Sequence, residues 1–350
     1  MTAIEQRMET GLDHIRGELR SVGDAVEAAL QEARRALFAR DARLAHQVVL
    51  GDYPVNRKAR NLDSRCHDFI GGFMPGAGAL REVTATIRVN VILERIGDHA
   101  VTIARESLRL ERDLPAAFRS MIENVADEST LMLANARTAF RKGDSEAAAG
   151  LMQGARRLEA RMDGVYEALF AEEDRLDATT TMVIFVVFNL YKRIADQARN
   201  ICEQTVYAVR GIDQFSRNHR VLFLAPPESP AASLALAIGR GRFAEAVEFD
   251  AATPGMPDTH APGLEEFLAG HGLSVVDDIE TLDSLSGKLP LYSVIVGLGR
   301  PVSDCLDKAP FHTSVLDWDI GEDVETAFQE LEGRISALVT LLTGFESEPG

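Results

Sequence analysis

Two acidic residues lie four positions apart within a mostly apolar stretch of the chain. Glu94 and Asp98 belong to the segment ERIGDHAVTIAR (94–105). On a helix, this spacing places the two carboxylates side by side on one face. Adjacent carboxylates on a helix that leans toward a core need a cation or hydrogen-bond donors, and oxygen ligands of this kind suit divalent metals. The spacing therefore predicts a metal site at Glu94 and Asp98.

A second interpretation of the same residues needs no metal. The two acids could belong to a surface patch that is neutralised by the nearby Arg88, Arg95 and Arg105. Asp52 shows a similar ambiguity, because its spacing from Asn56 and Asp63 presents oxygens on one side of a helix, as many solvated helix faces do. The spacing alone leaves both interpretations open.

The chain contains an internal duplication. ARRALFARD (33–41) resembles ARTAFRKGD (136–144), and ERIGDHAVTIAR (94–105) resembles KRIADQARNICE (192–203), at offsets of about 100 residues. In the second copy the acid pair is replaced by Lys192 and Asp196. Lys192 can reach Asp196 along the helix and neutralise it. We therefore expect any metal to prefer the first copy.

Six helices must position these residues. Apolar residues at three- and four-residue steps and a scarcity of proline before residue 217 predict helices over 4–40, 41–70, 75–112, 115–143, 145–175 and 179–210. We expect an irregularity near 51–54, Pro75 as the first residue of the third helix, Pro115 at the start of the fourth, and Asp144 or Ser145 as the cap of the fifth. The helices form two antiparallel three-helix repeats, residues 1–113 and 114–217.

Beyond residue 217 the pattern changes to short apolar runs separated by helical stretches. Strands are predicted at 220–225, 246–252, 291–298 and 314–318, and helices at 231–241, 263–271 and 323–343. This alternation predicts a small parallel α/β domain over 218–350. The fold class is thus an α-helical bundle of two tandem repeats plus a small parallel-sheet α/β domain.

Charge, cysteine usage and hydropathy limit the functions and locations that the sequence allows. The net charge is −17, and 218–350 alone has 7 basic against 22 acidic residues. Such an acidic half argues against a nucleic-acid partner. The three cysteines are far apart in the sequence, and no signal peptide is evident, which together predict a cytoplasmic protein. The longest apolar run has seven residues (182–188), which is too short for an integral membrane segment.

The helical half resembles the PhoU family of phosphate-uptake regulators. The resemblance rests on PGAGALREVTATIRVNVIL (75–93), ERIGDHAVTIAR (94–105) and NLYKRIADQARNICEQTVYAVRG (189–211), and it covers roughly residues 1–215. It implies metal ligands at Glu94 and Asp98 in the first copy, Asp196 in the second, and Asp52 on the preceding helix, with iron, zinc or manganese as the metal. The sequence departs from the family pattern at Lys192, Gln197, Thr102 and Ala79.

The C-terminal half resembles the low-molecular-weight phosphatase and arsenate-reductase fold. RVLFLAPPESPAASLALAI (220–238) is similar to that family's strand, phosphate loop and helix, but Ala225 stands in place of the nucleophilic cysteine and Ala231 in place of the phosphate-binding arginine. Because that chemistry requires a thiolate and a guanidinium, we expect a degenerate, inactive domain. Glu322 or Asp323 lies near the position of the family's acid.

The resemblances imply a regulatory adaptor in phosphate uptake and phosphate-starvation signalling, not an enzyme. Its implied partners are the ATPase subunit of the phosphate ABC transporter and a sensor histidine kinase, through which it would lie at the inner membrane. A homodimer is left open. Two other functions are considered: a metal-dependent hydrolase using Glu94, Asp98 and Asp52, and a metal-free helical scaffold.

Overall fold

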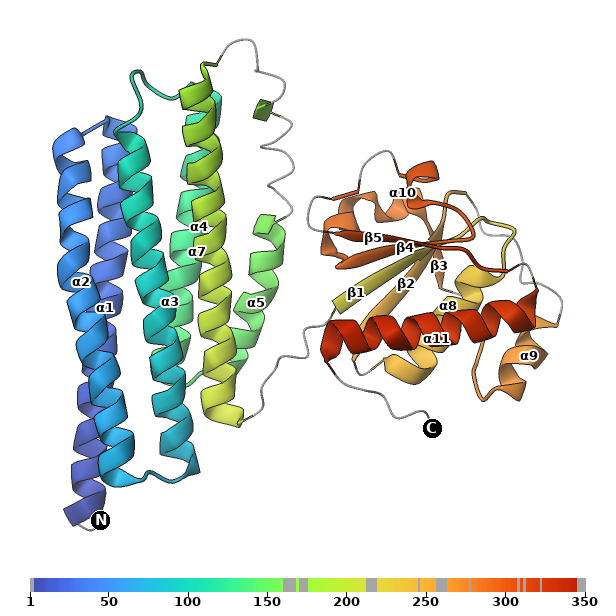
Figure 1. Ribbon diagram of the computed structural model, residues 1–350, viewed down its shortest axis with the longest axis horizontal. Coiled ribbons are helices and arrows are strands. Elements are labelled where there is room, and N and C mark those ends of the chain that lie inside the picture. The colour runs from blue at the N-terminus through green and yellow to red at the C-terminus, as the bar shows by residue number, and fades with distance from the viewer. Residues whose placement is uncertain are drawn as a thin grey trace. The chain divides into compact units, whose positions relative to one another are not determined.

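The computed structural model contains two compact units, Met1–Gln214 and Phe215–Gly350 (Figure 1). It describes residues 3–159, 168–169, 176–211, 219–244, 246–255, 263–276, 278–306, 309–310, 313–321 and 323–344. The first unit is helical and the second has a parallel five-stranded sheet, which confirms the predicted fold class. No helix in the described ranges is long and apolar enough to cross a membrane.

The first unit is built from two groups of helices. The first repeat comprises α1 (Ala3–Ala39), α2 (Ala42–Phe73) and α3 (Ala77–Ser107), and the second comprises α4 (Ala116–Lys142), α5 (Ser145–Glu159) and α7 (Ala178–Arg210). Within each repeat the helices pack on one another, and α3 packs on α7 to join the repeats. One continuous apolar core runs through both repeats.

The duplication produces a reciprocal pair of ion pairs between the repeats. Arg137 on α4 pairs with Asp24 on α1 at 2.6 Å, and Arg34 on α1 pairs with Asp127 on α4. The two acids are separated by the same 103 residues as the two arginines. Each repeat therefore contributes one acid and one arginine to the same contact, as in an interface with twofold symmetry.

Helix ends follow local capping chemistry, with two departures from the sequence-based expectations. Asp144 accepts a hydrogen bond from the Ala147 amide at 2.9 Å and caps α5, as expected. The expected irregularity near 51–54 is wrong, because α2 continues through Pro54, whose exposed ring faces solvent. Pro75 also lies outside α3, which is capped by Gly76 and begins at Ala77.

The second unit contains a parallel sheet in the order β3-β2-β1-β4-β5 (Figure 1). Its strands are β1 (His219–Leu224), β2 (Val247–Thr253), β3 (Ile279–Thr281), β4 (Val294–Leu298) and β5 (Ser314–Trp318). The register pairs Leu224 with both Ala252 of β2 and Gly297 of β4. The chain order reverses between β1 and β4, and such a switch point is where open α/β sheets usually bind ligands.

Both faces of the sheet are covered. Helices α8 (Ala231–Phe243) and α11 (Val324–Thr343) bury one face, and α9 (Leu264–Gly270) contributes Phe267 against Phe328 of α11. The other face packs on α10 (Leu282–Leu285) and the 3-10 helices η1 (Ser286–Leu291) and η2 (Val302–Asp304). Sequence periodicity missed β3, α10, η1 and η2, because segments of three to six residues are too short to show a period.

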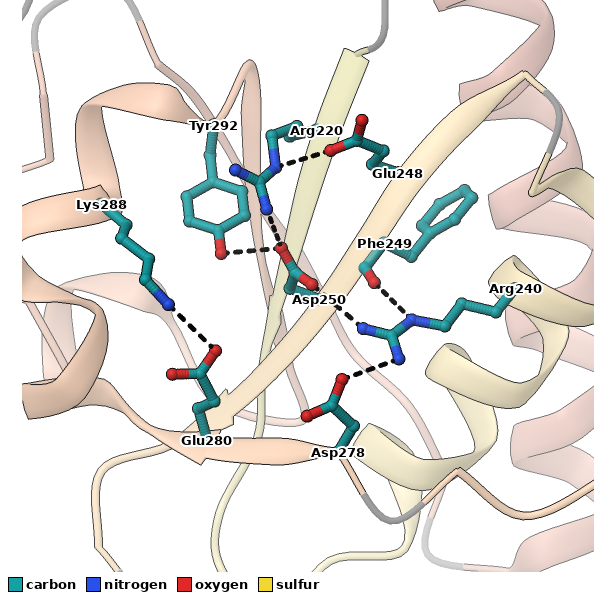
Figure 2. A network of polar contacts seen from close by, with 9 residues as sticks. All are labelled: Arg220, Arg240, Glu248, Phe249, Asp250, Asp278, Glu280, Lys288 and Tyr292. Atoms are coloured by element: carbon teal, nitrogen blue, oxygen red, sulfur yellow. Dashed lines mark hydrogen bonds and ion pairs between the residues drawn. The ribbon is translucent and has the colours of Figure 1, made fainter.

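A polar network fastens the amino-terminal half of β2 to its neighbours (Figure 2). Asp250 on β2 accepts hydrogen bonds from Arg220 at 3.0 Å, Arg240 at 3.0 Å and the Tyr292 hydroxyl at 2.9 Å. Arg240 also donates to the Phe249 carbonyl at 2.8 Å. Since β3 pairs with β2 only from Ala251 onward, Arg240 satisfies a carbonyl at an otherwise open edge.

Candidate functional site

The structure brings Asp52 of α2 close to Asp98 of α3. Burial raises the pKa of the Asp52 carboxyl and the Asp98 carboxylate raises it further, whereas Asn56 and Arg105 oppose the shift. Asn56 donates to Asp52 at 2.6 Å, which fixes the orientation of that carboxylate. Gly97, next to Asp98 in the chain, faces Asp52. A methyl group added at Gly97 would lie 3.7 Å from Asp52 Oδ1. The two acids were found separately in the sequence, and the packing of α2 on α3 brings them together.

Glu94 and Asp98 lie on the outer side of α3. Glu94 is half-buried and Asp98 is exposed. Among the described residues neither forms an ion pair with Arg88, Arg95 or Arg105, although Arg105 acts on the neighbouring Asp52. Arg88 instead donates to Gln204 at 3.3 Å and lies over the Tyr207 ring at 5.2 Å, both on α7.

These acids are not arranged as a complete metal centre. In the part of the chain that the structure describes, no three His, Cys, Asp or Glu side chains gather where they could hold a metal ion. The side chains as placed therefore do not fit a preformed metal site. The prediction of iron, zinc or manganese at Glu94, Asp98 and Asp52 remains a prediction.

The second copy is neutralised internally. Lys192 Nζ lies 3.6 Å from Asp196 Oδ2, one turn apart on α7. This contact confirms that Lys192 reaches Asp196. An ammonium group in place of a second carboxylate leaves this copy with less negative charge to attract a cation.

His99 follows Asp98 directly, so on an ideal helix it points about 100° away from that residue. The structure places it half-buried and near Arg193 of α7. Burial lowers the pKa of the imidazole, Arg193 and Arg95 lower it further, and Asp98 opposes them. The ring is therefore neutral at physiological pH, with one nitrogen able to accept a hydrogen bond.

The second unit places the loop after β1 at the switch point of its sheet. Residues 225–230 follow β1 and lead into α8, where a phosphate loop would lie. Ala225 and Ala231 are buried methyl groups, 1% and 4% exposed. Pro226, Pro227 and Pro230 supply no amide hydrogen for an anion. The loop contains neither a cysteine nor an arginine.

The neighbouring acids of this unit have structural roles. Asp317 of β5 accepts a hydrogen bond from the Val302 amide at 2.8 Å. Asp323 caps α11 by accepting from the Thr326 amide at 3.0 Å. Glu322 lies outside the described residues. Asp317 and Asp323 each hold a turn or a helix end in place.

Sequence reasoning missed the arginines that join the two repeats. Arg137 lies in ARTAFRKGD, and its partner Asp24 is ten residues before the equivalent Arg34. At these positions the two repeats are offset by 103 residues. Comparing charged residues at that offset, as well as the motifs, would have indicated this reciprocal contact.

Fold and site together define a class of protein: a duplicated three-helix bundle that displays an acidic motif on α3, followed by an α/β unit. The PhoU domain matches this chain at residues 19–107 and again at 122–205. The phosphate-specific transport system accessory protein PhoU homolog of Pseudomonas putida is 30% identical over 218 residues, which are 60% of this chain and 83% of that protein. The chain belongs to the PhoU family.

A solved PhoU structure agrees with this assignment. The crystal structure of PhoU from Pseudomonas aeruginosa is 28% identical, covers 58% of this chain and 99% of its own, and has a TM-score of 0.56. Arsenate reductase from Archaeoglobus fulgidus is 24% identical, covers 34% of this chain and 98% of its own, and has a TM-score of 0.29.

Proposed function

We propose that this protein is a regulatory adaptor of phosphate uptake and phosphate-starvation signalling that acts by binding partners. The observation that carries the proposal is that the two helical repeats span 83% of a relative named as an accessory protein of the phosphate-specific transport system. The partners we propose are the ATPase subunit of the phosphate ABC transporter and a sensor histidine kinase. These place the protein in the cytoplasm, at the inner membrane.

Binding of the transporter ATPase subunit tests this proposal. We expect the full chain to retain the purified ATPase subunit from the same organism on an affinity column. Glu94→Ala/Asp98→Ala should weaken retention, because it removes the acid pair on the outer side of α3. Asp63→Ala/Asp68→Ala is the matched control, since it removes two acids from α2 about 16 to 24 Å further along that helix than Asp52. No retention of either the ATPase subunit or the kinase by the wild-type chain would overturn the proposal.

We propose that metal binding prefers the first copy over Asp196 of the second. We expect Asp98→Ala to lower the bound iron, zinc or manganese, measured by plasma mass spectrometry, more than Asp196→Ala does. The reason is that Lys192 already neutralises Asp196 at 3.6 Å, whereas Asp98 lies beside a second carboxylate, Asp52. Equal losses from the two variants, or the reverse order, would contradict the preference for the first copy.

Assays of catalytic turnover distinguish the adaptor function from the hydrolase function. We expect the purified chain to hydrolyse no phosphomonoester and reduce no arsenate, because alanines occupy the positions of the nucleophile and the phosphate-binding arginine. Burial raises the pKa of the Cys305 thiol, so this cysteine is a poor nucleophile at neutral pH. A rate that disappears in Cys305→Ser would contradict the inactive second unit, and a rate that disappears in Glu94→Ala/Asp98→Ala would favour the hydrolase.

A further inference from the structure

A cavity of about 690 Å³ lies inside the helical unit, where the two repeats meet. Helices α1 and α3 of the first repeat and α4 and α7 of the second all contribute to its lining. Its volume is within the range of small-molecule binding sites. Apolar side chains form part of the lining, namely Leu19, Val89, Leu93, Phe140 and Val209. The cavity is therefore able to bury the apolar body of a ligand.

The carboxylates that line this cavity are already neutralised. Glu82 of α3 accepts hydrogen bonds from Arg16 of α1 at 2.6 and 2.9 Å. Asp24 and Glu27 of α1 both pair with Arg137, at 2.6 and 2.5 Å. The Arg137 side chain is only 14% exposed and crosses from one repeat to the other. These three acids therefore present little net negative charge to the cavity.

Three cations at the cavity have no such neutralisation. Arg20 of α1 and Arg141 and Lys142 of α4 line it, and none forms an ion pair with any residue that the structure describes. Gly78 brings the first turn of α3 to the same cavity, and the positive end of a helix dipole adds to the attraction for an anion. Positive charge and apolar surface thus meet in one partly open cavity.

We propose that this cavity binds an amphipathic organic anion, with its apolar body against the side chains of α1, α3, α4 and α7 and its carboxylate, sulfonate or phosphate head beside Arg20, Arg141 and Lys142. Such a ligand contacts both repeats at once. Its binding therefore couples their packing to the concentration of a small molecule. The proposal uses none of the residues of the acid pair on α3 and is independent of the adaptor function.

A simpler role for two of the cations predicts a different result. Arg141 and Lys142 lie in the last turn of α4, where basic residues stabilise the negative end of the helix dipole. If this were their whole function, their replacement would lower the thermal midpoint without changing ligand affinity. Binding affinity and thermal midpoint must therefore be measured on the same variants.

Displacement of a fluorescent probe tests the proposal on the full chain. We expect anilinonaphthalene sulfonate to bind with one-to-one stoichiometry and to be displaced by decanoate below its micellar concentration. Decyltrimethylammonium, which has the same alkyl chain and a cationic head, should bind at least 10-fold more weakly. Inorganic phosphate has an anionic group but no apolar chain, so it should displace the probe poorly. Equal displacement by the two surfactants would overturn the proposal.

Substitutions at the cavity test whether decanoate binds there. Arg20→Ala/Arg141→Ala should weaken decanoate at least 10-fold, and Ala208→Phe, which places a ring in the cavity, should abolish binding while circular dichroism stays helical. Arg57→Ala is the matched control, since Arg57 is exposed on α2 and does not line the cavity. Wild-type affinity in Arg20→Ala/Arg141→Ala would overturn the proposal. Should that variant fail to fold, unchanged binding by a folded Ala208→Phe would overturn it instead.

Discussion

Replacing Asp250 by alanine is expected to destabilise the second unit by about 2 to 4 kcal/mol. Asp250 is the acceptor shared by Arg220, Arg240 and the Tyr292 hydroxyl, and its side chain is only 21% exposed (Figure 2). Removing the Asp250 carboxylate leaves two partly buried guanidinium groups with less negative charge beside them. The Tyr292 hydroxyl also loses its hydrogen-bond acceptor. Leaving such groups without partners costs more than the hydrogen bonds themselves contribute.

Urea unfolding followed by tryptophan fluorescence measures this effect on the full chain. Trp318 is the only tryptophan in the sequence and lies on β5, so its signal reports the second unit. Asp278→Ala is the matched control, because the Asp278 carboxylate contacts the same Arg240 at 3.0 Å but is 66% exposed. Its loss should cost less than about 1 kcal/mol, as for other exposed ion pairs. Equal effects of the two variants would show that Asp250 is no more than a surface partner.

Replacing Gly297 by alanine is expected to cost about 3 kcal/mol. Gly297 lies on β4, and an added Cβ would be 2.3 Å from the Arg300 carbonyl oxygen and 3.0 Å from both Asp317 Oδ1 and the Val302 nitrogen. The obstacle is backbone, which cannot rotate away as a flexible side chain could. The turn after β4 must move, and the 2.8 Å hydrogen bond from Val302 to Asp317 is strained or lost.

The same tryptophan signal reports this change, because Trp318 pairs with Leu298 directly after Gly297. Gly287→Ala is the control, since nothing lies within 4 Å of a Cβ added there. We expect the control to change the free energy of unfolding by less than about 1 kcal/mol, in either direction. Wild-type stability of Gly297→Ala would mean that the turn at Arg300 adapts without cost.

Sequence periodicity was sufficient for the long elements. In the first unit, the five helices whose described ends can be compared begin and end within a few residues of the predicted ranges, except that α3 ends at Ser107 instead of near residue 112. Their amphipathic faces repeat over many turns, so local sequence carries the signal. The fifth helix was predicted to reach 175, and α5 is described to Glu159, beyond which most residues lie outside the described ranges.

The acid pair on α3 shows where such reasoning stops. The spacing of Glu94 and Asp98 placed both on one helix, but it could not say whether arginines neutralise them. The packing of α2 on α3 decided that Asp52 lies near Asp98. The packing of α3 on α7 decided that Arg88 turns toward Gln204 and Tyr207. In the second copy the pairing of Lys192 with Asp196 was predictable, because both lie one turn apart on the same helix.

By itself the sequence determined the helical repeats, their duplication, and the strand and helix alternation of the second unit. All of these depend on residues close together in the chain or on direct self-similarity. Only the tertiary structure decided the network around Asp250, the close approach at Gly297 and the cavity between the repeats, since each joins residues from several elements. Contacts between elements depend on packing distances and side-chain directions that local periodicity does not encode.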